Sequence, residues 1–115
     1  MKFIVLICSL CFAFNSVCAA VKSSNVIKGY EAGGEAKEIT ITYINGVGEG
    51  IAWTNAILKN EGRQPLFCKP SNMAFDGEGH YQLFRIEYFR NQKLYESVPP
   101  AYPLLMSLIR AYPCP

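Results

Sequence analysis

Residues 35–60, EAKEITITYINGVGEGIAWTNAILKN, decide the fold because two patterns compete within them. Residues 38–44 alternate in polarity and are rich in β-branched side chains, which is typical of a strand. Over the whole stretch the helical period fits better. Its apolar side chains recur at helical spacing, at Ile39, Tyr43, Val47, Ile51 and Leu58. We therefore predict one helix here, ended by Glu61 and Gly62.

Gly46 and Gly50 stand four residues apart in this predicted helix. Each costs about 1 kcal/mol relative to alanine in a helix. Their spacing places two small residues on one helix face, where another helix can approach closely.

Outward from this stretch, three more segments have helical patterns. Residues 24–30 form a weak helix at best, with Ser23 or Ser24 as its cap, and residues 101–112 form an apolar helix that tolerates Pro103 in its first turn. Residues 81–92 form an amphipathic helix with Leu83, Ile86, Tyr88 and Phe89 as its apolar residues and Arg85, Glu87 and Arg90 between them. Residues 76–79 are either its first turn or a preceding loop. The predicted fold is all-α, a small bundle of three to four short helices around one core.

The first twenty residues indicate a cleavable signal peptide. Lys2 precedes an apolar stretch at residues 3–14, and small residues follow up to Ala19 and Ala20, either of which suits cleavage. The apolar stretch is shorter than the roughly 20 residues that a membrane-spanning helix needs, and no later stretch reaches that length. We expect an exported single domain, residues 21–115, without stable membrane insertion. Lipidation at Cys18 is the alternative.

Removal of residues 1–20 would leave two of the five cysteines, Cys68 and Cys114. An even count in an exported chain favours a disulfide between them over two free thiols. The eleven Lys and Arg lose Lys2 and become ten, against nine Asp and Glu. This near-neutral balance argues against nucleic acid as a partner, because such proteins carry clustered basic charge.

The sequence predicts no enzyme, cofactor or metal site. His80 is the single histidine, and no serine has the spacing of a nucleophile elbow. The run from Asp76 to His80 resembles a loose set of metal ligands, but a solvated helix start explains it better. The glycines of residues 46–50 lack the Lys-Ser/Thr of a phosphate loop.

A protein partner is the better expectation. Tyrosine and arginine are common interface anchors, and Arg85, Tyr88, Arg90 and Tyr95 cluster in sequence. The segments 72–80 and 90–95 are irregular and polar, as binding loops often are, although plain connections have the same composition. The predicted partner contacts are Asn72, Asp76, Glu78, His80, Arg90 and Tyr95.

Four segments resemble, in order, the motifs of one family, the Rap/Tai immunity proteins associated with type VI secretion systems of Gram-negative bacteria. Residues 42–47, Thr-Tyr-Ile-Asn-Gly-Val, resemble its Gly-Tyr-Ile-x-Gly-Val segment, and residues 67–70, Phe-Cys-Lys-Pro, resemble its Phe-Cys-x-Pro loop. Tyr88 and Phe89 stand where the family has a Tyr-Leu pair. Pro100-Ala101, Leu104-Leu105 and residues 111–114 resemble its final Pro-Ala…Ala-Phe-Pro-Cys helix.

The resemblance implies a periplasmic, mainly helical protein that binds and inhibits a peptidoglycan amidase effector. Some family members do so as homodimers, so a homodimer is one option here. A general periplasmic binding or envelope-stress module of the same fold, without a dedicated toxin, is the alternative.

The family often carries two further cysteines, where this chain has Tyr30 and Thr40. Their joint absence implies that the two retained cysteines pair with each other. Their absence also leaves the first helix, which lies beside three glycines, without a disulfide, so we predict that this helix is the least stable part.

Overall fold

The computed structural model describes residues 20–115, so the predicted signal peptide lies, apart from Ala20, outside the described residues. Residues 20–115 contain helices and no strand, which confirms the all-α prediction. The five helices of this part are α2 (Ser23–Glu31), α3 (Gly34–Asn60), α4 (Gly77–Arg90), α5 (Gln92–Tyr95) and α6 (Ala101–Ala111). Residues 38–44 are helical. With 27 residues, α3 confirms the single helix predicted over residues 35–60, although it exceeds the other, short helices of the bundle.

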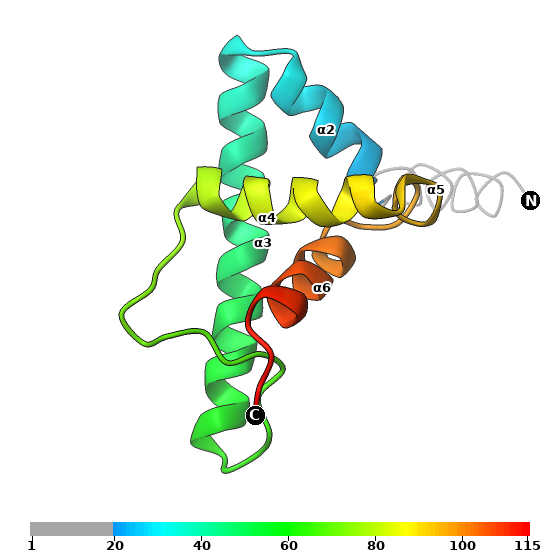
Figure 1. Cartoon of the computed structure of the whole chain (residues 1–115). Coiled ribbons are helices and arrows are strands. Elements are labelled where there is room, and N and C mark those ends of the chain that lie inside the picture. The colour runs from blue at the N-terminus through cyan, green and yellow to red at the C-terminus, as the bar shows by residue number, and fades with distance from the viewer. Residues whose placement is uncertain (1–19) are drawn as a thin grey trace, which may run out of the picture.

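The long helix α3 is the axis around which the other helices are arranged (Figure 1). Helix α4 crosses α3 and packs on it, α2 packs against the first half of α3, and α6 packs against α4 and α3. None of the helices in the described range is both long enough and apolar enough to cross a membrane.

The hydrophobic core lies where these helices meet. Ile44 of α3, Phe84 of α4 and Leu104 of α6 have no exposed surface, and Val26 and Ile27 of α2 are buried beside them. The face of α3 that turns inward is marked by Thr40, Ile44 and Gly48. The predicted apolar residues Ile39 and Tyr43 of α3 are exposed instead.

Helix α4 turns a different side inward than its amphipathic pattern suggested. Ile86 and Phe89, predicted as apolar face residues, are exposed, whereas Glu87 is buried. Successive turns place Phe84, Glu87 and Tyr88 on one face, because residues three and four apart are neighbours on a helix. The prediction was therefore right for Tyr88, which is buried, and for Leu83, which packs against the core, but wrong for Ile86 and Phe89.

The start of α4 follows the first of the two options for residues 76–79. Asp76 is the N-cap and its carboxylate accepts a hydrogen bond from the Gly79 backbone N–H at 2.8 Å. Helix α2, in contrast, has no side-chain cap, because Ser23 is buried and its hydroxyl donates to the Val98 carbonyl at 2.8 Å. The prediction that Ser23 or Ser24 caps α2 was therefore wrong.

The disulfide between Cys68 and Cys114 is confirmed, with 4.9 Å between the two Cα atoms. It joins the loop after α3 to the end of the chain after α6. The Asn55 side chain fixes the same loop, since its amide donates to the Phe67 carbonyl at 2.9 Å and its carbonyl accepts from the Leu66 N–H at 2.6 Å.

Candidate partner-binding surface

The six residues predicted as partner contacts fall into two groups at opposite ends of α4. Asp76 precedes the first residue of α4 and Arg90 is its last. At 1.5 Å per residue they lie about 20 Å apart along the helix. The structure therefore does not bring the six residues together as one site.

The first group surrounds the start of α4. Asn72 and Asp76 are exposed, whereas Glu78 is half-buried and accepts hydrogen bonds from the Tyr30 hydroxyl and, at 3.1 Å, from the Gln82 amide. The bond from Tyr30 is the main reason that the pKa of Glu78 is lowered. The Glu78 carboxylate thus binds side chains of this protein itself, and its bond to Tyr30 connects α4 to α2.

His80 is buried beneath this group. Its Nδ1 lies 3.0 Å from the Asn45 Oδ1, and its ring packs so closely on Gly48 that a Cβ there would stand 2.5 Å from it. Burial lowers the pKa of His80, so the ring is neutral at pH 7. His80 therefore joins α4 to α3, and a partner could not reach it without a rearrangement.

Asp76, Glu78 and His80 had also suggested a loose set of metal ligands. Their side chains make the separate contacts given above. Across residues 20–115, no three His, Cys, Asp or Glu side chains are grouped so that they could hold a metal ion.

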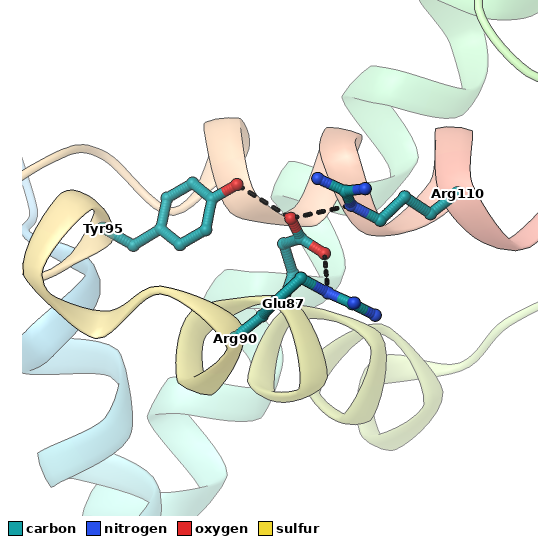
Figure 2. A network of polar contacts seen from close by, with 4 residues as sticks. All are labelled: Glu87, Arg90, Tyr95 and Arg110. Carbon is teal, nitrogen blue, oxygen red and sulfur yellow. Dashed lines mark hydrogen bonds and ion pairs between the residues drawn. The ribbon is translucent and has the colours of Figure 1, made fainter.

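The second group centres on Glu87, a carboxylate buried between α4, α5 and α6 (Figure 2). Its Oε1 accepts hydrogen bonds from the Tyr95 hydroxyl at 2.8 Å and from the Arg110 Nε at 3.1 Å. Its Oε2 lies 3.3 Å from the Arg90 Nε. Tyr95 is itself buried, and burial together with the hydrogen bond to Glu87 raises its pKa to about 12. Tyr95 therefore serves to hold Glu87 and does not lie on the surface.

Both arginines use Nε toward Glu87 while their side chains remain about half exposed, 56% for Arg90 and 51% for Arg110. One buried negative charge thus holds two positive charges at the surface. Both arginines line a hollow of about 190 Å³, whose other lining residues are Leu83, Ile86, Glu87, Ser107 and Ala111.

Exposed apolar side chains continue along α4 from this hollow. Ile86 lines it, and Phe89, three residues further along α4, lines a second hollow toward α2 and has the Arg85 guanidinium 5.0 Å above its ring. We call the surface formed by Arg85, Ile86, Phe89, Arg90 and Arg110 the α4–α6 face. It combines exposed aromatic, aliphatic and guanidinium groups, as the centres of protein interfaces do.

Sequence reasoning identified Arg85 and Arg90 but missed Glu87 and Arg110. One signal was available for Glu87, which stands three residues after Phe84 and three before Arg90 on one helix. Arg110 gave no comparable signal, because its contact with Glu87 joins residues 23 apart in the chain.

Comparisons with protein-family models, curated proteins and solved structures find no match for this chain.

Proposed function

We propose that this protein is a periplasmic immunity protein that binds and inhibits a peptidoglycan amidase effector of a type VI secretion system. The observation that carries the proposal is that the motifs of the resemblance supply core residues. Ile44, Phe67, Tyr88 and Leu104, one from each motif, are all buried in one cluster. The resemblance thus concerns the residues that hold the helices together.

The disulfide adds support, because the resemblance implied the same pair of cysteines, Cys68 and Cys114. An oxidised pair is also compatible with an exported protein. Inhibition by binding requires a rigid surface and no catalytic group of its own, and the α4–α6 face offers such a surface.

The α4–α6 face is the surface that we assign to the amidase. Two of its three basic side chains, Arg90 and Arg110, are held by Glu87, so they have less side-chain freedom to lose on binding. Its exposed Ile86 and Phe89 would supply apolar contact area. Arg85 and Arg90 add positive charge beside them, which favours an acidic surface around the amidase cleft.

A growth-protection assay tests this proposal. A candidate peptidoglycan amidase effector from the genome that encodes this protein is exported to the periplasm, and survival is compared with and without this protein. We expect protection by the wild type and loss of protection by Arg85→Glu. Arg63→Glu makes the same charge change at an exposed residue in the loop after α3 and should still protect.

Lysis of cells that carry the wild-type protein would count against the proposal. Equal protection by both variants would leave inhibition standing but would show that the α4–α6 face is not the contact surface.

A further inference from the structure

Helix α3 carries an apolar stripe that the rest of residues 20–115 leaves largely exposed. Its large members are exposed, Ile39 by 61%, Tyr43 by 38%, Trp53 by 71% and Ile57 by 53%. Gly46 and Gly50 complete it, and no atom lies within 4 Å of where a Cβ would stand at either glycine. The six positions follow the alternating spacing of four and three residues that defines a helix–helix seam.

This stripe is separate from the side of α3 that packs into the core, which is marked by Thr40, Ile44 and Gly48. It is also separate from the α4–α6 face. The inference that follows therefore does not rest on the proposed function.

The stripe has the same pattern in both directions along α3. Counted from Gly48, glycines stand two residues away on each side, the aromatic residues Tyr43 and Trp53 five residues away, and Ile39 and Ile57 nine residues away. An interface with two-fold symmetry requires such a self-complementary surface, because residue i must meet residue j and residue j must meet residue i.

We propose that α3 is a self-association surface on which two copies of this chain pack antiparallel, with the two-fold axis near Gly48. Gly46 of one copy then meets Gly50 of the other at the crossing point, where the absence of side chains lets the helix axes approach closely. Tyr43 meets Trp53, and Ile39 meets Ile57. The antiparallel arrangement also sets the two helix dipoles against each other, which is favourable.

A hollow next to Tyr43 supports a second copy as the occupant. It measures about 220 Å³ and is lined by Val21, Asn25, Val26, Ile39, Thr40 and Tyr43. In the antiparallel pair it receives the Trp53 side chain of the other copy, and the symmetry repeats this contact. Trp53, the most exposed large apolar side chain among residues 20–115, thus gains an apolar hollow at the matching distance from the axis.

The size of the stripe indicates a modest affinity. Its exposed side chains and the rim of the hollow offer on the order of a few hundred Å² per copy, below the roughly 800 Å² per partner of a standard interface. We therefore expect a dimer with a Kd of about 1–100 μM.

The experiment is sedimentation equilibrium combined with tryptophan fluorescence over this concentration range. The chain is exported with its own leader, purified, and its N-terminus identified by mass spectrometry. Trp53 is the only tryptophan, so its emission reports directly on the stripe. We expect a dimer at about 100 μM, with emission that moves to shorter wavelength as the dimer forms.

Two variants on the stripe and one matched control locate the interface. Trp53→Gln and Gly50→Gln should each weaken the Kd at least about tenfold. Lys59→Gln places the same residue at an exposed position on the opposite side of α3, two residues after Ile57, and should leave the Kd unchanged. Gly50→Gln should not lower the melting temperature, because glutamine forms helix better than glycine and open space surrounds the position.

Cysteine cross-linking tests the direction of packing. The double variant Gly46→Cys and Gly50→Cys should form a covalent dimer on oxidation, whereas either single variant should not. Efficient cross-linking of the single variants would indicate parallel packing and would overturn the proposed register.

Three further results would overturn the proposal. One is a monomer at about 100 μM with unchanged emission. Another is a dimer that both stripe variants leave intact. The last is a monomer that retains residues 1–19 and whose Trp53 is already shielded, because those residues would then be the occupant.

Discussion

Glu87 is the residue on which the α4–α6 face depends. Its carboxylate contacts Tyr95, Arg110 and Arg90 from within the protein, so one buried charge fixes three side chains. The arginine heads remain partly hydrated, which reduces the strength of each ion pair.

Replacing Glu87 with Gln should lower the free energy of unfolding by about 2 kcal/mol, because a neutral amide weakens two charge-assisted contacts in a buried position. Chemical denaturation measures the loss. Glu38→Gln, at an exposed position of α3, is the control and should change stability by less than about 0.5 kcal/mol. Equal effects of the two substitutions would show that Glu87 has no organising role.

Two glycines of α3 only two residues apart should respond oppositely to alanine. At Gly48 a Cβ would collide with the His80 ring, so Gly48→Ala should cost about 1–3 kcal/mol. At Gly46 the space is open, so Gly46→Ala should stabilise the helix by up to about 1 kcal/mol. Thermal unfolding of the two variants measures the difference, and a Gly48→Ala variant that is as stable as Gly46→Ala would contradict the packing of His80 on α3.

His80 should make stability depend on pH below neutrality. Burial lowers its pKa, so the unfolded chain takes up a proton near pH 6.5 while the folded protein resists it. The unfolded state then binds more protons, and stability falls as the pH drops from about 7 to about 5. Glu49 and Asp76 oppose this shift and Lys69 adds to it. In His80→Gln the loss of melting temperature over this range should be smaller than in the wild type, and an equal loss would refute the assignment.

At the scale of single residues, the sequence predicted residue types better than their surroundings. Arg90 was expected at the surface and is there, but Ile86 and Glu87 exchanged their expected places. A helix of mixed composition has more than one plausible inner face. In α4 the contacts with α3 and α6 determine which face is buried. Those contacts are between distant parts of the chain, which local periodicity does not contain.

At the scale of elements, α3 was predictable because its helical spacing extends over many turns. The strand-like alternation of residues 38–44 is too short to compete once the whole stretch is helical. The four-residue helix α5 was not foreseen, since it is a single turn capped by Asn91 within a connection. The disulfide was predicted from the cysteine count after removal of the leader.

Helix α2 remains the predicted weak element. Gly33 and Gly34, both with positive φ, connect it to α3, and no disulfide reaches it. It is held by the buried Val26 and Ile27, by the stacking of Tyr30 on Tyr81 with ring centroids 3.7 Å apart, and by the hydrogen bonds of Ser23 to Val98 and of Tyr30 to Glu78.

Hydrogen exchange measures this difference between helices. The amides of α2 should exchange at least about tenfold faster than those of α6, which the disulfide anchors through Cys114. Equal protection of both helices would mean that the core contacts of α2 compensate fully for the absence of a disulfide in α2.

At the scale of the whole molecule, the sequence predicted the fold class but not where its functional surfaces lie. The all-α fold follows from patterns within single helices. The α4–α6 face, in contrast, needs Glu87 and Arg110 from two helices, and the α3 stripe is recognisable only once the inward side of α3 is known. The two predicted binding segments, residues 72–80 and 90–95, lie at opposite ends of α4, because the helix between them holds them apart.

The proposed inhibition of a peptidoglycan amidase is tested by a titration. The amidase whose toxicity this protein suppresses in the growth assay is assayed on purified peptidoglycan while the purified protein is added in increasing amounts. We predict that activity falls in proportion to added protein and is abolished near a one-to-one ratio of chains. Full amidase activity in the presence of a large excess of the protein would contradict the account.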